Sequence, residues 1–191
     1  MNLKLNNAQL YGLAMAYGYD YRALKAIIQV ESGQTGFSKE TGRLIIQFEP
    51  AWFKRFKTDW QKDTSHKTWQ ANKVGNQTSE WIAFNDAFAL DADAAMKSTS
   101  VGMMQIMGFH YAELGFQTVG EMWDFAKVSE YNQVELALKW IKTIPALDRA
   151  LQSKNWQKVA YYYNGAGYKR FNYDKRLADA HSKASAYLSN N

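Results

Sequence analysis

The sequence contains no cysteine, and this absence excludes several kinds of chemistry at once. A chain without thiols has no disulfide, no thiolate nucleophile and no thiolate metal site. Histidine is also scarce, because His66, His110 and His181 are far apart and never show the close spacing that places two metal ligands on one helix turn. We therefore expect neither a metal centre nor a cofactor.

Proline is nearly as rare, with only Pro50 and Pro145, so long stretches can run as helix without a breaker. The first twenty residues carry no long apolar run and no clear cleavage site, and we expect neither a signal peptide nor a membrane span. The 191 residues contain no repeat, low-complexity segment or Gly/Ser-rich linker. They predict one globular domain over 1–191.

Positive charge is unevenly placed along the chain. Residues 139–191 hold ten Lys/Arg against three Asp/Glu, whereas residues 1–138 hold thirteen against fifteen. The whole excess of positive charge thus lies in the last quarter, with a basic segment at about 169–191. Such a segment favours an anionic partner, such as a nucleic acid, an anionic membrane or a cell-wall polymer, although an ordinary solvated surface explains it equally well.

Apolar spacing predicts a mainly α fold. Helices are expected over 7–17, 21–31, 51–57 and 80–97, with three further helices opened by caps at Thr118, Ser129 and Asn155, and a last one over 173–188. A turn at Gly42 and a strand over 44–48 predict a small β-hairpin element near residues 37–49. Residues 59–78 are expected to form an irregular surface excursion, and the run STSVGMMQIMGFHYAELG a short helix between glycines.

Glu31 is the first candidate for chemistry. It shares an apolar stripe with Leu24, Ile27 and Ile28 at the end of the predicted helix 21–31. Loss of water and the negative end of the helix dipole both disfavour a charged carboxylate, so we expect its pKa to be raised. A general acid needs such a pKa to hold its proton at working pH. On periodicity alone, an acid at this position is more often a simple helix-boundary residue.

A second carboxylate, Glu49, ends the more polar face of the predicted strand, after Ile45 and Gln47. Glycoside hydrolysis pairs one carboxylic acid of raised pKa with a second, ionised carboxylate. The contrast between an apolar site for Glu31 and a polar site for Glu49 fits that pairing. The sequence does not give the distance between them, which separates inverting from retaining chemistry.

Four motifs occur in order along the chain: VESGQTGF, IIQFEP, SVGMMQIMGF and YYYNGAGY. Together they resemble the phage and prophage N-acetylmuramidase endolysins of the lysozyme-like superfamily, and more distantly goose-type lysozymes and lytic transglycosylases. The segments SEYNQVELALKWI and NYDKRLADAH resemble this family as well. The resemblance covers about residues 20 to 181 and implies a single lysozyme-like domain.

The resemblance also implies roles for individual residues. Glu31 would be the general acid, and Glu49 would position water or stabilise the oxocarbenium-like transition state. Ser32 would help to orient the acid. Five residues would bind the substrate, namely Ser32, Gln105, Tyr163, Asn164 and Tyr168. Separately, we interpret Gly33 and Gly36 as leaving room for a sugar chain to come close.

Two departures from the family pattern bear on substrate contacts. Val101 stands where the family usually has Trp, which removes a stacking contact, and Ala166 replaces the usual Pro, which leaves the loop after Asn164 less rigid. Met103 and its apolar neighbours are better explained as core. Of the tryptophans in the excursion, Trp60 and Trp69 are weak candidates for the rim of a cleft.

The implied activity is cleavage of the β-1,4 bond between N-acetylmuramic acid and N-acetylglucosamine in peptidoglycan glycan strands. We expect a monomer without a nucleic-acid partner, accumulating in the host cytoplasm and reaching the cell wall through a holin-type lesion at lysis. The basic C-terminal segment would contact anionic envelopes. The alternatives are a lytic transglycosylase, which makes 1,6-anhydro-muramic ends with the same Glu31, and a non-catalytic wall- or nucleic-acid-binding protein.

Overall fold

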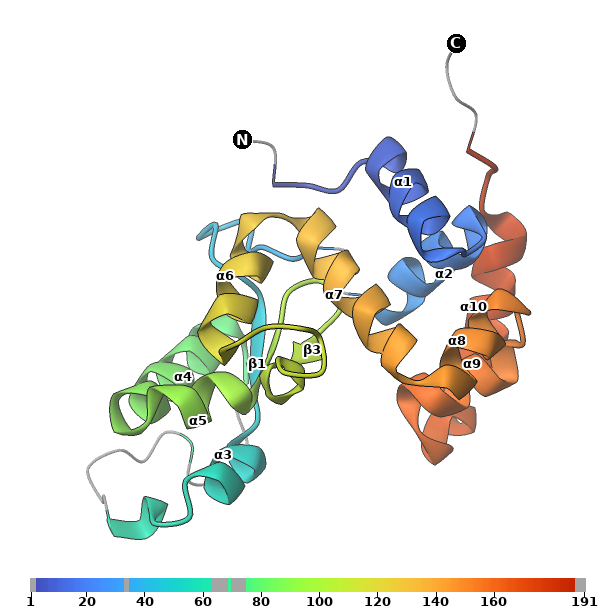
Figure 1. The fold of residues 1–191 in the computed structure, drawn as a ribbon. Helices are drawn as coiled ribbons and strands as arrows, with labels where there is room; N and C mark the ends of the chain where they lie inside the picture. The colour runs from blue at the N-terminus through green and yellow to red at the C-terminus, as the bar shows by residue number, and fades with distance from the viewer. Residues whose placement is uncertain (1–2, 33–34, 63–68, 70–74, 188–191) are drawn as a thin grey trace.

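Two helical lobes, spanned by one long helix, make up the structure (Figure 1). This computed structural model describes residues 3–32, 35–62, 69 and 75–187. The first lobe contains α1 (Asn7–Tyr17), α2 (Tyr21–Glu31), α8 (Pro145–Gln152), α9 (Trp156–Asn164), the 3-10 helix η3 (Ala166–Phe171) and α10 (Tyr173–Lys183). The second contains β1 (Ile46–Phe48), α3 (Pro50–Phe56), η1 (Trp60–Lys62), α4 (Gln77–Leu90), α5 (Ala92–Lys97), β2 (Thr99–Val101), β3 (Ile106–Met107), η2 (Gly108–His110) and α6 (Val119–Val128). Helix α7 (Glu130–Thr143) joins the lobes.

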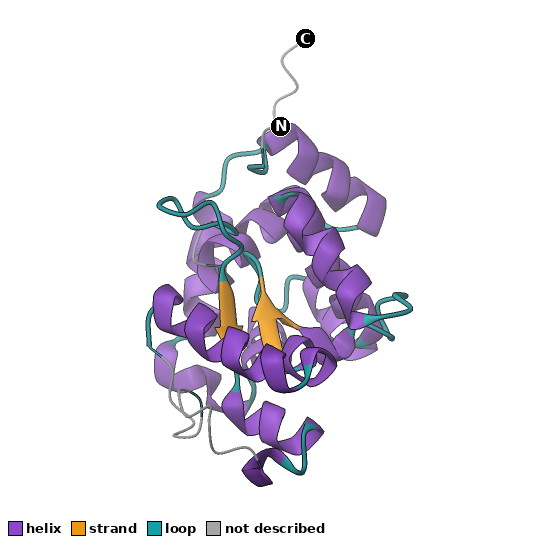
Figure 2. Ribbon diagram, turned by 90° about the vertical axis from the view of Figure 1, so that its left-hand side faces the viewer, coloured by secondary structure: helices purple, strands orange, loops and turns teal. Residues whose placement is uncertain are grey.

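A small antiparallel sheet, in the order β1-β2-β3, lies among the helices of the second lobe (Figure 2). Ile46 pairs with Val101, and Val101 pairs in turn with Ile106. An isolated bridge between Phe37 and Leu44 precedes β1. The mainly α fold with a small β element near 37–49 is thus confirmed.

The short helix predicted after Lys97 is wrong, because this stretch forms β2 and β3. Its β-branched residues Thr99, Val101 and Ile106 suit a pleated strand. Gly102 has φ +74° and Gln105 has φ +53°, values that a right-handed helix does not contain. The chain therefore turns back on itself within the motif SVGMMQIMGF.

Local capping explains most of the predicted helices that are confirmed. Asp20 opens α2 by accepting a hydrogen bond from the Ala23 N–H at 2.9 Å. Asp91, with extended backbone, ends α4 and caps α5 by accepting from the Ala94 N–H at 2.9 Å, so the single helix predicted over 80–97 is two helices. The last helix ends at Lys183 rather than at residue 188. Within the described ranges, no helix is long and apolar enough to cross a membrane.

The predicted surface excursion is in part core. The Trp69 side chain is fully buried, with its ring 4.9 Å from that of Phe53 and 5.8 Å from that of Trp60. The assignment of Trp69 to the rim of a cleft is therefore wrong. An indole supplies a large apolar surface, and here it contacts Phe53 of α3 and Trp60 of η1.

Two buried polar side chains of α7 hold the lobes together. The Gln133 amide accepts from the Met103 N–H at 2.7 Å and donates to the Ala126 carbonyl at 3.1 Å. The Glu130 carboxylate accepts from the backbone N–H groups of Leu5, at 3.0 Å, and of Gly36, at 2.9 Å. Three segments that are distant in sequence, at Leu5, Gly36 and Met103, are thereby fixed to one helix, together with the end of α6.

Gly36 leaves space for a side chain of the protein itself, whereas we expected it to leave space for a sugar. A Cβ at Gly36 or at Gly102 would overlap the Gln133 side chain. Both glycines therefore make room for Gln133, and the interpretation of Gly36 as room for a sugar is wrong. Gly33 lies outside the described residues.

Candidate active site

Glu31 is the last residue of α2, and its side chain is half-buried. The Asn164 Nδ2 group, at the end of α9, donates a hydrogen bond to Glu31 Oε1 at 2.9 Å. Burial raises the pKa of Glu31, and the smaller opposing effects of the Asn164 hydrogen bond and the Arg176 charge do not cancel it. The pKa is raised, as expected from the apolar stripe.

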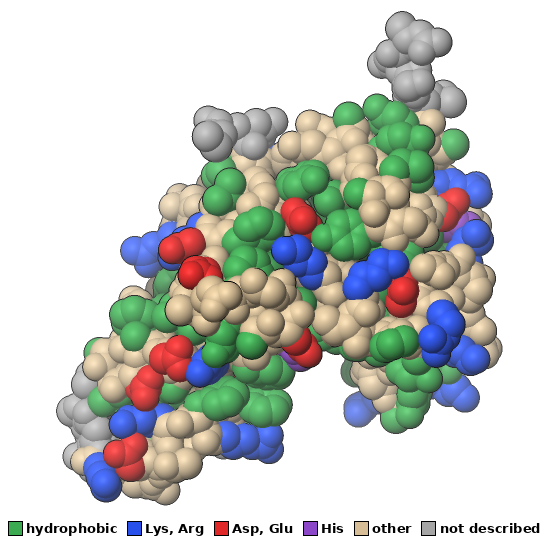
Figure 3. Space-filling view, in the orientation of Figure 1, with side chains coloured by type: hydrophobic (Ala, Val, Ile, Leu, Met, Phe, Trp, Pro, Cys, Tyr) green, Lys and Arg blue, Asp and Glu red, His purple; other side chains and the backbone are tan. Residues whose placement is uncertain are grey.

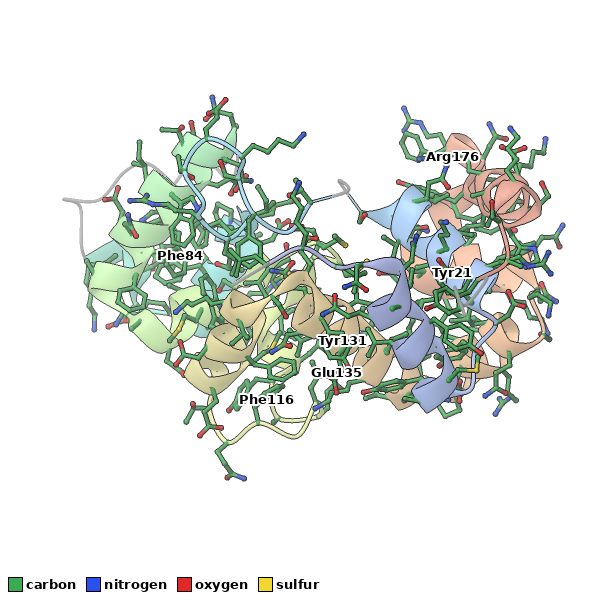
Figure 4. All side chains as sticks on the ribbon, turned by 90° about the horizontal axis from the view of Figure 1, so that it is seen from above. Tyr21, Phe84, Phe116, Tyr131, Glu135 and Arg176 are labelled. Carbon is green, nitrogen blue, oxygen red and sulfur yellow. The ribbon has the colours of Figure 1, made fainter. Side chains whose placement is uncertain are left out.

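The end of α2 is held in place by its neighbours. The Ser32 Oγ group donates to the Ile28 carbonyl at 2.5 Å, and Arg176 Nη2 of α10 donates to the Val30 carbonyl at 3.4 Å. These donors satisfy carbonyls that a helix end leaves without a partner. Seen from above, Arg176 lies in the lobe of α2 and α10, far from Phe84 in the other lobe (Figure 4).

Tyr163 places a hydroxyl group close to this acid. The group is buried and has no hydrogen-bond partner among the described residues, while the ring makes an edge-on contact with Trp140 at 5.3 Å. Burial, and then the negative charge of Glu31, raise the pKa of Tyr163. The hydroxyl therefore keeps its proton beside Glu31.

Glu49 stands where β1 passes into α3. Its backbone carbonyl accepts from the Trp52 N–H at 2.9 Å, and its own N–H donates to the Ser98 carbonyl at 2.9 Å. The half-buried side chain accepts a hydrogen bond from Gln47 Nε2 at 2.8 Å. The strand face predicted to be polar thus holds an amide and a carboxylate in contact.

A third carboxylate, Glu80 on α4, lies behind this strand and was missed by the sequence analysis. It is 6% exposed, and its Oε2 accepts from the Phe48 N–H at 2.7 Å. Burial raises the pKa of Glu80, and the charge of Glu49 acts in the same direction, against the lowering effect of the Phe48 bond. The signal in the sequence was a charged residue four positions before Phe84, on an apolar helical stripe.

Replacing Glu80 by Ala should lower the free energy of unfolding by about 1–3 kcal/mol, because the Phe48 N–H loses its buried partner. Glu80→Gln keeps an acceptor and should lose less. The raised pKa means that the folded state binds the proton more tightly than the unfolded state, so wild-type stability should fall as pH rises through this pKa. Glu80→Gln should lack that dependence.

Thermal unfolding across pH tests this prediction, with Asp124→Ala as a control at an exposed surface acid. A Glu80→Ala protein as stable as the control would contradict it.

Gln105 closes the turn between β2 and β3. Its Oε1 accepts from Ser100 Oγ at 2.7 Å, and its Nε2 donates to the Gly102 carbonyl at 2.7 Å. Gln105 also lines a cavity of about 280 Å³ together with Gln47 and Glu80. The structure thus brings Gln105 to the polar face of the sheet, and its contact with a sugar stays a prediction.

The other predicted residues differ in their surroundings. Tyr168 is 8% exposed and contacts the ring of Tyr161 at 6.5 Å, so most of its surface serves packing. Val101 is buried in the central strand, where its side chain belongs to the core. Met103 and Ile106 are buried as well, as expected for core residues. The roles of Ser32 and Tyr168 toward a substrate stay predictions.

Comparisons with known proteins agree with the predicted resemblance. The sequence model of the N-acetylmuramidase family matches residues 20–185. The structure is similar to the crystal structure of the Burkholderia AP3 phage endolysin, with a TM-score of 0.85 and 30% sequence identity, covering 95% of this chain and 70% of that chain. No curated protein matches. The family match spans α2 through α10 and includes Glu31, Glu49 and Asn164.

Proposed function

Since the chain belongs to the N-acetylmuramidase family, and is thus a lysozyme-type glycoside hydrolase of peptidoglycan, we propose that it cleaves the β-1,4 bond between N-acetylmuramic acid and N-acetylglucosamine. The observation that carries this proposal is the half-buried Glu31, whose pKa is raised by burial and whose carboxyl is held by Asn164. Membership of an enzyme family sets aside the alternative of a non-catalytic binding protein.

In this proposal Glu31 donates its proton to the glycosidic oxygen as the bond to the anomeric carbon breaks. The electron pair of that bond stays with the leaving oxygen, and positive charge develops on the sugar ring. Glu49 supplies negative charge toward this ring and positions water. The water oxygen bonds to the anomeric carbon, and one of its protons restores the acid.

The residues around the two acids have supporting roles in the proposal. Tyr163, which lies beside Glu31, contributes to the walls of the site together with Gln105 and Tyr168. Ser32 helps to set the orientation of Glu31 by fixing the end of α2.

The likeness to a phage endolysin favours a role in lysis of a bacterial host. We propose that the described chain is one muramidase domain that acts as a monomer. It passes from the host cytoplasm to the cell wall through a holin-type lesion. Its basic segment at about 169–191, with Lys169, Arg170, Lys175, Arg176 and Lys183, contacts the anionic envelope.

Mass spectrometry of digested, purified peptidoglycan tests the proposed bond and reaction. Digestion in ¹⁸O-labelled water should give fragments that end in reducing N-acetylmuramic acid and carry one ¹⁸O atom. A lytic transglycosylase would give unlabelled 1,6-anhydro ends, and new reducing ends on N-acetylglucosamine would indicate the other bond. Either result would overturn the proposal.

The Asn164→Ala substitution should move the pH profile of turnover. The lost hydrogen bond lowers the pKa of Glu31 in the wild type, so its removal should raise this pKa further. The basic limb of kcat/KM, which reports loss of the proton from the free enzyme, should move to higher pH.

Initial rates on peptidoglycan across pH measure this shift. Asn85→Ala is the matched control, because the Asn85 side chain is exposed on α4 in the second lobe. It should leave the basic limb of kcat/KM in place. A basic limb that stays fixed or moves to lower pH in Asn164→Ala would argue against Glu31 as the acid.

A further inference from the structure

Aromatic rings connect the acid in the first lobe with the second lobe. Tyr163, beside Glu31, contacts Trp140 of α7 at 5.3 Å between ring centroids. Trp140 lies 6.0 Å from His110 of η2, and His110 lies 4.3 Å from Phe109. These contacts form an unbroken row across the junction between the lobes.

The row continues onto α3, the helix that Glu49 begins. Phe109 contacts Trp52 at 4.7 Å, and Trp52 stacks on Phe56 at 6.0 Å with an interplanar angle of 22°. The Arg55 guanidinium lies over the Trp52 ring at 4.7 Å. We call the rings of Tyr163, Trp140, His110, Phe109, Trp52 and Phe56 the aromatic track.

The aromatic track is open to solvent, unlike the core. Phe56 is 40% exposed and the other members are half-buried, whereas Phe53, next to Trp52 on α3, is fully buried. In Figure 3 the molecule is indented at its lower edge between the lobes, and hydrophobic side chains gather with Lys and Arg on the second lobe beside this indentation. Because these rings are only partly buried, packing of the core does not explain why these positions are aromatic.

We propose that the aromatic track is a saccharide-binding surface, which holds N-acetylhexosamine rings of the glycan strand on the Glu49 side of the bond that is cleaved. This inference rests on the proposed function, because it takes the strand to pass between Glu31 and Glu49. Pyranose rings present apolar C–H faces that pack on aromatic rings, and the track continues without a break from the acid. Arg55 keeps the Trp52 ring in place and offers N–H donors to sugar oxygens.

Binding of a chitin hexasaccharide, measured by calorimetry, tests the surface without turnover. The measurement uses Glu31→Gln as the parent protein and adds Phe56→Ala, Trp52→Ala or both. The double substitution should weaken binding about tenfold, equivalent to about 1.4 kcal/mol. Phe88→Ala is the matched control, since Phe88 is 43% exposed on α4 and contacts Phe84, and it should leave binding unchanged.

The same substitutions in the active enzyme should raise KM for peptidoglycan about tenfold and change kcat less than twofold, because stacking away from the cleaved bond adds equally to ground-state and transition-state binding. Trp52→Phe keeps a ring and should restore most of the affinity. If Trp52→Ala does not fold, Phe56→Ala carries the test alone, since its ring is exposed.

Hexasaccharide binding as tight in the double variant as in the parent would overturn the proposal. A second result would also overturn it. If the parent protein formed concentration-dependent dimers in sedimentation, and the double variant lost these dimers but kept its affinity for the hexasaccharide, the aromatic track would be a contact between copies of the chain. Both results are independent of which bond the enzyme cleaves. An unexpected product would overturn the proposed function and leave the binding result as it stands.

Discussion

Glu31→Gln should lower turnover of peptidoglycan about 10³-fold, because the amide has no proton to give to the leaving oxygen. The substitution keeps the size of the side chain and leaves an oxygen that can accept the Asn164 hydrogen bond. Binding of glycan strands should therefore persist. Rates of release of soluble fragments, with binding to insoluble wall measured in parallel, separate the two properties.

The stability of Glu31→Gln gives an internal check on its fold. Burial disfavours the charged form of Glu31, so wild type should lose stability as pH rises through the raised pKa of this acid. The variant should then be at least as stable as wild type at neutral pH and should lose this advantage in acid. Glu135→Gln, an acid on α7 that accepts from the Tyr17 hydroxyl, is the control for activity. Equal turnover in Glu31→Gln and wild type would remove Glu31 from the mechanism.

Gly108→Ala should lower the free energy of unfolding by about 3 kcal/mol, at the upper end of what overpacking costs. A Cβ at Gly108 would overlap the Met96 carbonyl and lie 3.1 Å from Lys97 Cα. Both obstacles are backbone atoms at the end of α5, so no side chain can rotate away. Either η2 must move, together with Phe109 and His110, or the end of α5 must distort.

Thermal unfolding measures this loss, which corresponds to a fall in Tm of about 6–12 °C for a chain of this length. Gly12→Ala is the matched control, because a Cβ there meets no atom within 4 Å and lies in the helix α1. Alanine is favoured over glycine in a helix, so the control should be unchanged or slightly more stable. Equal stability of the two variants would contradict the close packing of η2 on α5.

Helix α2 and its acid were predictable because their signals are local. Asp20 caps the helix, and Leu24 and Ile27 recur at helical spacing toward the core, with Glu31 on the same stripe. The same spacing that buries the stripe also withdraws Glu31 from water. A single sequence contains all of this information.

The hairpin of β2 and β3 was not predictable in this way. Its strands are short, and β2 pairs with β1, which lies about fifty residues earlier in the sequence. Pairing with this distant strand outweighs the local apolar spacing, which favours a helix. The left-handed backbone of Gln105 gives no local signal either, since this conformation is uncommon for residues other than glycine. Tertiary contacts decide the structure of this motif.

The contacts of the buried polar side chains were also not predictable from the sequence. Glu80, Glu130 and Gln133 each bond to backbone groups more than twenty-five residues away, and periodicity marks them only as charged or polar residues on apolar stripes. Asn164, in contrast, was identified by family resemblance. Its contact with Glu31 spans 133 residues and has no signal in local spacing.

The pKa of the Glu31 carboxyl in the free enzyme tests the central claim most directly. A ¹³C NMR titration of protein labelled at glutamate carboxyl carbons measures it, with the resonance assigned by its absence in Glu31→Gln. Burial of Glu31 predicts a pKa above that of an exposed glutamate, coincident with the basic limb of kcat/KM. A Glu31 pKa at or below that of an exposed glutamate would contradict its role as the proton donor.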